Sequence, residues 1–404
     1  MNKKKSIRKC PICQEENGEI LHTQKFVLPE GHPLSNGYDI LCCDRCGFVY
    51  ADTTVSQKDY DIFYAKLSKY EDKKTATGGG ESPYDAARLQ KTAECIAGFL
   101  PDKSVRILDI GCANGGLLGY LKKLGYNNLC GLDPSPACVE NTKQLYGIEA
   151  YAGSIFTPPQ DLGDFDVVIL SHVLEHIQDL ASALSNFKNL LGKNGVLYAE
   201  VPDAKKYLDF YVSPFHYFDT EHINHFSLKF LERLLIPAGF TLIGKGEKEF
   251  ELHPGTFYPA IWVMAGFSNE KISLKSNLDN LDLELRNRTI EYTKHSQKDF
   301  DPQMIDELVL NQDKIIVWGV GSSTMRLLAN SSLERANIIA FVDSNPKYWG
   351  QYLMEKPIIS PEELKNRQFK NETETILLTS KIYGKEILAQ IVNELNLKNK
   401  VVTA

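Results

Sequence analysis

Four cysteines near the N-terminus have the spacing of a metal-binding site. They form two pairs with two residues between the thiols, Cys10 with Cys13 and Cys43 with Cys46. Four thiolates are the soft ligand set that tetrahedral Zn²⁺ prefers, and a complete set leaves no position for a catalytic water. We therefore expect a structural zinc site, with redox chemistry at a C-x-x-C pair as the alternative. Cys42 could replace Cys43, but only Cys43 keeps the two-residue gap to Cys46.

Reactive side chains are also concentrated between residues 216 and 225, which hold three of the nine histidines of the chain. A histidine can take up and return a proton near neutral pH, and a neighbouring carboxylate can orient it or balance its charge. We predict a general base here, and the candidate catalytic residues are His222, Glu221, Tyr217 and His225. A hydrogen-bonded surface loop is one alternative, and a second metal site is another, with ligands from His216, Glu221, His222 and His225.

A glycine-rich turn indicates a binding site of a different kind. A short β-like run over residues 105–110 is stopped by Gly111–Gly116, and leucines at helical spacing follow. A second run, 129–132, ends at Asp133, where open α/β sheets bind a ribose diol. The dinucleotide fingerprint G-x-G-x-x-G is not met, and Asp109, two residues before the first glycine, suits a cationic ligand better than a pyrophosphate. The pattern predicts the first units of a doubly wound sheet with a cofactor other than a dinucleotide.

The run Leu108–Gly116, Leu-Asp-Ile-Gly-Cys-Ala-Asn-Gly-Gly, resembles motif I of the class I S-adenosylmethionine (SAM) methyltransferases, with Ala113 in place of the usual middle glycine. Later segments follow in the order of that fold. Residues 152–155 resemble the adenine contact, 165–170 the fourth strand and 195–202 the fifth. The resemblance implies SAM contacts from Asp109, Gly111, Asn114, Gly115, Asp133, Pro134, Ser154, Ile155 and Ser171.

Two further histidines, His172 and His176, directly follow the segment that resembles the fourth strand. This stretch is a common structural feature of the class I fold, so the resemblance favours a packing and loop-orienting role for both. A catalytic role is the alternative, and the sequence does not decide between them.

The order of these features along the chain resembles the nucleotide-sugar C-methyltransferases. Those enzymes have an N-terminal zinc module, a central SAM domain and a C-terminal Rossmann-like domain, and they use an adjacent Glu–His pair with the histidine as base. The resemblance implies these roles for Glu221 and His222. The family also places a tyrosine two positions before the glutamate, where this chain has Asp219, and Tyr217 is the nearest candidate to replace it.

The C-terminal part repeats the pattern of strand, glycine turn and helix. The run 314–318 enters Gly319–Ser323, and the run 338–342 ends at Asp343. Backbone N–H groups of Gly321, Ser322 and Ser323 are candidate donors to a diphosphate at a helix N-terminus. A structural or dimerising domain and an NAD site are the alternatives. A helix start at Ser360–Glu363 and a last strand at 375–378 complete the predicted elements.

We therefore expect an α/β protein with four parts along the chain. They are a small N-terminal zinc-binding module with a connector (1–75), a central class I methyltransferase Rossmann-like domain (76–266), a helical linker (267–312) and a second, C-terminal Rossmann-like α/β domain (313–404). The triplet Gly78–Gly80, at the junction of the connector with the central domain, fits a mobile lid or a plain linker. In the linker, Leu274, Leu278, Leu281 and Leu285 share one helical face.

Composition limits the classes of function. With 43% hydrophobic and 24% charged residues, the chain has the composition of a soluble globular protein. The net charge of −7 argues against broad nucleic-acid binding, although a small basic patch is formed by Lys3, Lys4, Lys5, Arg8 and Lys9. No signal peptide or membrane-spanning run is visible, so we expect a cytoplasmic protein without a membrane partner. The oligomeric state is not predicted.

These features lead to one favoured function and two alternatives. We expect SAM-dependent methyl transfer to a small-molecule acceptor, a nucleotide-linked sugar, with C-methylation of a keto-sugar favoured and structural Zn²⁺ in the N-terminal module. The first alternative is O- or N-methylation of another saccharide or small metabolite. A distant alternative is nucleic-acid binding through the zinc module. The sequence identifies neither the sugar nor the carbon.

Overall fold

The computed structural model describes residues 2–67, 69–71, 78–79, 81–160, 162–267, 281–365 and 374–404. The chain groups into two compact units instead of four parts in sequence order. The first unit contains Met1–Leu21, Ile40–Phe210 and Glu221–Glu291, and the second contains His22–Asp39, Tyr211–Thr220 and Tyr292–Ala404. The cysteine region and the glycine turn of the predicted methyltransferase domain therefore share one unit.

The N-terminal strands form a five-stranded sheet in the order β1-β2-β3-β4-β10. Its strands are β1 (Lys3–Lys5), β2 (Asn17–Lys25), β3 (Gly37–Cys43), β4 (Val49–Asp52) and β10 (Asn224–His225). β2 and β3 form a hairpin between the two cysteine pairs, and its outer part, 22–39, belongs to the second unit. β10 pairs antiparallel with β4, so a short segment from the middle of the chain completes the N-terminal sheet.

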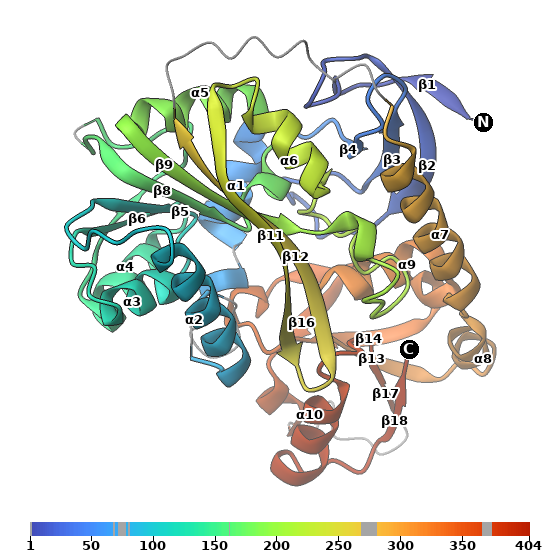
Figure 1. Cartoon of the computed structure of the whole chain (residues 1–404). Helices are drawn as coiled ribbons and strands as arrows, with labels where there is room; N and C mark the ends of the chain where they lie inside the picture. Colours follow the sequence, from blue (N-terminus) through green and yellow to red (C-terminus); the bar gives the residue numbers. More distant parts are fainter. Residues whose placement is uncertain are drawn as a thin grey trace. The chain divides into compact units, whose positions relative to one another are not determined.

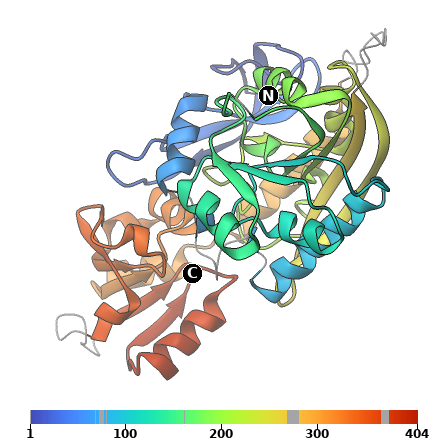
Figure 2. The ribbon, with the colours of Figure 1, turned by 90° about the vertical axis from the view of Figure 1, so that its left-hand side faces the viewer.

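A seven-stranded mixed sheet in the order β11-β12-β9-β8-β5-β6-β7 forms the main part of the first unit (Figure 1). Five strands are parallel neighbours: β5 (Ile107–Ile110), β6 (Leu129–Asp133), β7 (Glu149–Ala152), β8 (Phe165–Ser171) and β9 (Leu191–Pro202). The long antiparallel hairpin of β11 (Phe240–His253) and β12 (Thr256–Phe267) extends this sheet beyond β9 (Figure 2). This is the α/β arrangement that the sequence predicts, with β9 starting four residues earlier than expected.

Helices cover this sheet. The α-helices of the first unit are α1 (Gln57–Leu67), α2 (Pro83–Ala97), α3 (Gly116–Lys123), α4 (Pro136–Tyr146), α5 (Leu180–Leu190) and α6 (Leu228–Leu235), and the 3-10 turns are η1 (Lys69–Glu71), η2 (Leu174–His176) and η3 (Ala204–Lys206). Apolar side chains of α2 and α3 bury one face of the sheet in a common core, as Leu89, Ile96 and Leu118 show. Ser227 is the N-cap residue of α6, but its side chain makes no capping hydrogen bond.

The second unit is built on a sheet in the order β15-β16-β14-β13-β17-β18. Its strands are β13 (Lys314–Trp318), β14 (Asn337–Val342), β15 (Tyr352–Leu353), β16 (Lys356–Ile359), β17 (Thr375–Leu378) and β18 (Lys400–Thr403). Only the β15–β16 pair is antiparallel among the described strands of this sheet. The helical elements are α8 (Gln303–Leu310), α9 (Ser322–Asn330), η5 (Ser332–Arg335), η6 (Pro346–Tyr348), η7 (Pro361–Lys365), α10 (Gly384–Ala389) and the π-helical turn η8 (Gln390–Glu394).

Two local predictions for the C-terminal part have clear outcomes. The capping box is present, since Glu363 N–H donates to Ser360 Oγ at 3.3 Å and Ser360 N–H to Glu363 Oε1 at 3.1 Å, but it starts the 3-10 helix η7. The predicted linker helix is α7 (Leu283–Asp299), which begins after Leu281 and buries Leu285. Leu274 and Leu278 lie outside the described residues. In the described part of the chain, none of the helices has the length and hydropathy needed to cross a membrane.

A loop over residues 211–220 belongs to the second unit and is held there by side chains of α7 and α9. The guanidinium of Arg326, which is 5% exposed, donates to Pro214 O at 3.1 Å and to Phe218 O at 3.2 Å. Ser296 Oγ accepts from Phe215 N–H at 3.1 Å. These bonds fix the segment that directly precedes the predicted Glu221–His222 pair.

Candidate active site

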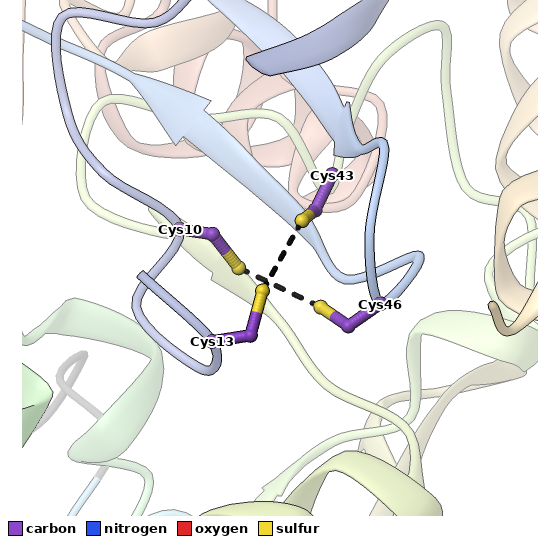
Figure 3. Close-up of side chains that lie close together, drawn as sticks. All are labelled: Cys10, Cys13, Cys43 and Cys46. Carbon is purple, nitrogen blue, oxygen red and sulfur yellow. Dashed lines mark hydrogen bonds between the residues drawn. The ribbon is translucent and has the colours of Figure 1, made fainter. Parts of the chain in front are cut away.

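The four predicted cysteines converge in one cluster (Figure 3). The Sγ atoms of Cys10 and Cys46 are 3.6 Å apart, and those of Cys13 and Cys43 are 3.4 Å apart. Tetrahedral Zn²⁺ with bonds of 2.3 Å to sulfur places its ligands about 3.8 Å from one another. Four thiols at nearly this spacing fit the ion. Cys43, and not Cys42, belongs to the cluster.

The cysteine module is attached to the segment that contains the predicted base. Ala51 N–H in β4 donates to Ile223 O at 2.9 Å, and β10 continues this pairing. Ile223 N–H donates to Glu175 O at 2.9 Å on the opposite edge. His222, the residue before Ile223, is therefore held between the sheet of the cysteine module and the loop that follows β8.

Arg8 strengthens this attachment. Its backbone N–H donates to Asp52 Oδ1 at 2.8 Å, and its buried guanidinium reaches Gln178 O at 2.6 Å and Asn224 Oδ1 at 2.9 Å. Burial lowers the pKa of Arg8 to about 10, so the side chain stays charged at neutral pH. One side chain next to Cys10 thus binds both segments that surround the predicted base.

The glycine turn lies at the carboxyl end of β5. Gly111 and Gly115 have φ angles of 75° and 79°, in the left-handed region that side chains rarely adopt. A Cβ on Gly115 would lie 2.6 Å from Thr142 Cγ2, so the turn needs glycine at this position. Ala113 also has a positive φ, 46°, which explains why this middle position of the turn favours glycine.

Two buried carboxylates lie at this turn. Asp109 is 3% exposed and Asp133 is 8% exposed. Burial, followed by the charge of Asp133, raises the pKa of Asp109 to about 8. Burial also raises the pKa of Asp133 to about 6, although Asp133 accepts N–H bonds from Ser135 at 2.8 Å and Ala113 at 2.9 Å, which lower it. A cationic ligand would offset the cost of these buried charges, because it favours the ionised carboxylates.

The remaining predicted cofactor residues lie at the same edge of the sheet. β5, β6, β7 and β8 are parallel, so their carboxyl ends meet there. Pro134 follows β6, Ser154 and Ile155 follow β7, and Ser171 ends β8. The structure therefore brings together all the positions that the class I resemblance implies.

Part of the connector also contacts this edge. Asn114 Nδ2 donates to Tyr70 O at 2.8 Å, and Ser135 Oγ donates to Glu71 Oε1 at 2.5 Å. Tyr70 and Glu71 lie in η1, which is part of the predicted connector. In the described residues, this part of the connector is bonded to the turn and to the start of α4. Residues 72–77 and 80 lie outside the described residues.

The predicted base, His222, lies beside a second histidine. The ring centres of His176 and His222 are 4.8 Å apart, and the rings meet edge to face. His176 Nδ1 is 3.1 Å from Glu221 O, and since a carbonyl only accepts, Nδ1 is the donor and Nε2 is left as the basic nitrogen. Tyr64 OH donates to Glu221 Oε2 at 3.3 Å. Two imidazoles next to a carboxylate can accept a proton from a substrate.

A buried ionic network adjoins these histidines. Glu175 Oε1 is 3.1 Å from His172 Nδ1 and 3.9 Å from His176 Nε2, and His172 Nε2 is 3.3 Å from Glu200 Oε1. Glu200 also pairs with Lys248. Burial lowers the pKa of His172, but the carboxylates of Glu175 and Glu200 outweigh it and raise the pKa above its usual value. Neither Glu175, Glu200 nor Lys248 is predicted from the sequence as part of the site. Only Glu200 could have been recognised, because it is a charged residue inside an apolar run.

The other predicted catalytic residues have different surroundings. His225 is fully buried in β10, and its Nδ1 lies 3.2 Å from Tyr207 OH. Tyr217 belongs to the second unit, where it is 1% exposed and its N–H donates to Tyr292 OH at 3.1 Å. The structure thus brings His222 and Glu221 together with His176, whereas His225 and Tyr217 are enclosed in packed environments.

The ligand set expected for a second metal site is not brought together in the described residues. The residues that approach His222 with ligand atoms are Glu175 and His176, in place of the expected His216 and His225, and their atoms lie within 4.8 Å of one another. His176 Nε2 and Glu175 Oε1 are 3.9 Å apart, so binding of a metal here would need a small side-chain rotation. We interpret these residues as an acid–base group, because His176 and His222 are adjacent imidazoles.

Comparison with known proteins assigns the central region. Residues 82–245 match the family model described as "Methyltransferase domain". This region is a methyltransferase domain. A second model, "C2185-like, N-terminal", matches residues 311–402.

The chain has curated relatives. An uncharacterized 37.1 kDa protein in transposon TN4556 of Streptomyces fradiae is 32% identical over 175 residues, which are 39% of this chain and 49% of that protein. The ubiquinone biosynthesis O-methyltransferase of Azorhizobium caulinodans is 33% identical over 103 residues, 24% of this chain and 40% of that enzyme. The chain therefore spans half the length of these relatives or less. Among solved structures, a SAM-dependent methyltransferase from Anabaena variabilis has a TM-score of 0.39 at 20% identity, over 50% of this chain and 93% of its own.

Proposed function

We propose that this protein transfers the methyl group of SAM to a nucleotide-linked sugar, with C-methylation of a keto-sugar favoured and His222 as the general base. One observation carries this proposal. The unit that contains most of the methyltransferase domain also contains the paired imidazoles of His176 and His222, with the backbone carbonyl of Glu221 bonded to His176 Nδ1. The sugar and its carbonyl come from the resemblance of the Glu–His pair to the nucleotide-sugar C-methyltransferases.

The turn at the end of β5 would hold the cofactor. When bound there, SAM supplies an electrophilic methyl group. Asp133 would accept hydrogen bonds from a ribose, and Asp109 would favour the positive charge of the ligand, because both carboxylates are buried at the strand ends. Gly111 and Gly115 keep side chains out of the turn, so that a ligand can approach the backbone closely.

His222 would perform the proton chemistry. It is only half-buried, so a substrate can reach it, and it would remove the proton from the carbon next to the sugar carbonyl. His176 and Glu221 would position His222. His176 Nδ1 donates to the backbone carbonyl of Glu221, the residue before His222, and this bond fixes the His176 ring beside the base. For a hydroxyl acceptor the same imidazole would take the hydroxyl proton.

We also propose that the four-cysteine cluster holds a structural Zn²⁺ that positions this base. The spacing of the sulfur atoms supports the ion, and the pairing of β4 with β10 connects the cluster to His222. Removal of the metal is therefore expected to reduce activity far more than it reduces the affinity for SAM. Chelation followed by calorimetric SAM titration and an activity assay measures both. Equal loss of the two would contradict the positioning role.

The test of the proposed function is mass spectrometry of nucleotide-sugars incubated with methyl-labelled SAM. The set includes 4-keto-6-deoxy sugars with deuterium next to the carbonyl, and fully hydroxylated sugars. We expect a labelled methyl on a keto-sugar together with loss of the deuterium. We expect His222→Asn to abolish the transfer while SAM binding is unchanged. Labelling of no sugar by a protein that binds SAM would overturn the acceptor class.

A second candidate is O- or N-methylation of another small molecule. The ubiquinone biosynthesis O-methyltransferase among the relatives favours it. Transfer to a hydroxylated sugar or another metabolite without loss of the deuterium would identify this reaction. Nucleic-acid binding is disfavoured, because Lys3, Lys4 and Lys5 are paired with Asp44, Asp52 and Glu16 at 2.9, 2.7 and 3.1 Å.

A further inference from the structure

A continuous series of titratable side chains leads from the proposed base through the edge of the main sheet. The series runs from His222 to His176, Glu175, His172, Glu200 and Lys248. Glu175 and Glu200 are 1% and 0% exposed. Carboxylates that are so deeply buried are expensive, and methyl transfer at His222 does not by itself need either of them.

The far end of the series reaches solvent. Lys248 Nζ is bonded to Tyr198 OH at 2.7 Å and to Thr92 Oγ1 at 3.1 Å, and it lines a pocket of about 270 Å³ together with Arg88, Lys91 and Thr92. This pocket lies between α2 and the β11–β12 hairpin, and the SAM-binding positions at the strand ends are not among its lining residues. It therefore offers water a contact with the series outside the proposed active site.

Methyl transfer produces one proton for each product. A C–H or O–H bond of the acceptor breaks and its electron pair forms the bond to the methyl carbon. The bond between that carbon and sulfur breaks with its electrons left on sulfur, and the acceptor proton stays on His222. The base works again only after this proton has left. While both substrates are bound, they restrict direct transfer of the proton from His222 to solvent at the acceptor side. A second route for this proton would therefore let the base recover.

We propose that His176, Glu175, His172, Glu200 and Lys248 form a proton path that carries the acceptor proton from His222 to water in the pocket of Lys248. The role of the path in catalysis rests on the proposed function, but the path itself can be tested in the protein without an acceptor. Along it, Glu175 and Glu200 accept a proton from one imidazole and return one to the next group. Lys248 releases its own proton to water and takes one from Glu200.

The distances along the path indicate how each step occurs. The contacts of His172 with Glu175 and Glu200, at 3.1 and 3.3 Å, are within direct reach of a proton. The contact of His176 Nε2 with Glu175 Oε1, at 3.9 Å, needs one bridging water or a small side-chain rotation. The step from His222 to His176 has the same requirement. These two steps are therefore expected to be the slow ones.

Two substitutions interrupt the path, and one neighbouring substitution is the control. Lys248→Arg keeps the positive charge beside Glu200, but a guanidinium does not give up its proton in proteins. Glu200→Gln keeps the shape but replaces the carboxylate with an amide, which does not relay a proton. Lys91→Met is the matched control, because Lys91 is exposed and lines the same pocket outside the path.

The first experiment needs no acceptor. The exchange of the imidazole N–H protons of His172 and His176 with solvent is measured by NMR in protein saturated with S-adenosylhomocysteine. We expect exchange about tenfold slower in Lys248→Arg and Glu200→Gln, and unchanged exchange in Lys91→Met. Unchanged exchange in Lys248→Arg would overturn the path whatever the acceptor is. If Glu200→Gln fails to fold, Lys248→Arg decides alone, because it retains the ion pair.

The second experiment uses the labelled 4-keto-6-deoxy nucleotide-sugar and separates the first turnover from the later ones. The first turnover needs only a deprotonated His222, whereas later turnovers need its proton to leave. In Lys248→Arg we expect the first turnover at the wild-type rate, followed by steady turnover about tenfold slower. Equal slowing of both phases would indicate a structural effect and overturn the path. Absence of product in the wild type would reject the proposed acceptor, and the exchange measurement would still decide on the path.

Discussion

The two glycine turns of this protein, one in each unit, are built by the same contacts and differ in one buried charge. In the methyltransferase domain, Gly111 N–H donates to Leu132 O at 2.7 Å, and in the second unit Gly319 N–H donates to Val342 O at 2.7 Å. The next strand ends in each case in an aspartate that accepts a backbone N–H from the turn. Asp133 accepts from Ala113 and Asp343 accepts from Val320, both at 2.9 Å.

The difference lies two residues before the first glycine. The methyltransferase turn has Asp109 there, whereas the second turn has Val317, and both side chains are buried. Two buried carboxylates, Asp109 and Asp133, therefore face the first turn, whereas one half-buried carboxylate, Asp343, faces the second. The shared contacts explain the fold of each turn, and the extra carboxylate favours a cation at the first turn only. Nucleotide binding at the second turn stays a prediction.

The largest expected effect comes from adding one methyl group to each turn. Gly115→Ala forces a left-handed φ on alanine and places its Cβ 2.6 Å from Thr142, so we expect a loss of stability of about 2–4 kcal/mol and loss of SAM binding. Gly321 has φ of −80° and open space at its Cβ position. Gly321→Ala is expected to change stability by less than about 0.5 kcal/mol. Urea unfolding measures both, and similar losses would show that the turns are constrained alike.

The paired aspartates test which turn binds SAM. Asp133→Asn is expected to weaken SAM binding about 100-fold, since it removes a charged acceptor at the strand end. Asp343→Asn makes the same change of carboxylate to amide in the other unit and is expected to leave SAM affinity unchanged. Calorimetric titration of both variants measures the difference. Weaker SAM binding in Asp343→Asn would contradict the assignment of SAM to the first turn.

The extra carboxylate predicts that replacement of Asp109 stabilises the ligand-free protein, and that this stabilisation grows as the pH rises. The pKa of Asp109 is about 8 in the folded protein, against about 3.9 in an unfolded chain. Between these values the folded state binds more protons, so this group makes the protein less stable as the pH rises from 4 to 8. Asp109→Asn is therefore expected to be more stable than the wild type at pH 9, by about 1–3 kcal/mol, and to bind SAM more weakly.

The measurement is urea unfolding of both proteins without ligand at pH 5 and at pH 9. The advantage of Asp109→Asn should grow with pH. An advantage that is the same at both pH values would mean that folding does not raise the pKa of Asp109, because the folded and unfolded states would then bind the same number of protons over this range.

The smallest expected effect is that of a substitution at Ala113, whose N–H reaches Asp133. Ala113 has a φ of 46°, so Ala113→Gly is expected to relieve strain and to stabilise by about 0.5 kcal/mol after the entropy of glycine is subtracted. Val320 is fully buried and has an ordinary φ, so Val320→Gly is expected to destabilise by about 2 kcal/mol or more. Thermal unfolding compares the two, and the same sign for both would remove this difference between the turns.

Both turns and the cysteine cluster could be predicted from the sequence, because their geometry is set by neighbouring residues. A glycine with positive φ after a strand, and an aspartate at the end of the next strand, leave a short-range pattern. The two C-x-x-C pairs do the same for the cluster. The spacing also indicates the right partner in the choice between Cys42 and Cys43.

The surroundings of the proposed base could not be predicted in this way. The pairing of Asn224 with Tyr50 joins segments far apart in the sequence, and it depends on how the whole unit packs. Lys248 lies in a strand of alternating charges, where nothing local distinguishes the lysine that pairs with buried Glu200. The grouping of 211–220 with the C-terminal residues is likewise a consequence of packing, so consecutive domain boundaries do not describe it.

That grouping limits how the protein can be divided or recombined. The loop 211–220 is bonded to Ser296, Tyr292 and Arg326, all of which come from the last third of the chain. A fragment that ends before Tyr292 would keep every proposed SAM-binding position, yet would leave Phe215 and Tyr217 without their hydrogen-bond partners. The methyltransferase domain is thus not expected to fold completely when it is separated from the C-terminal residues. If C-terminal parts were exchanged between related enzymes, residues 211–220 would have to be exchanged together with them.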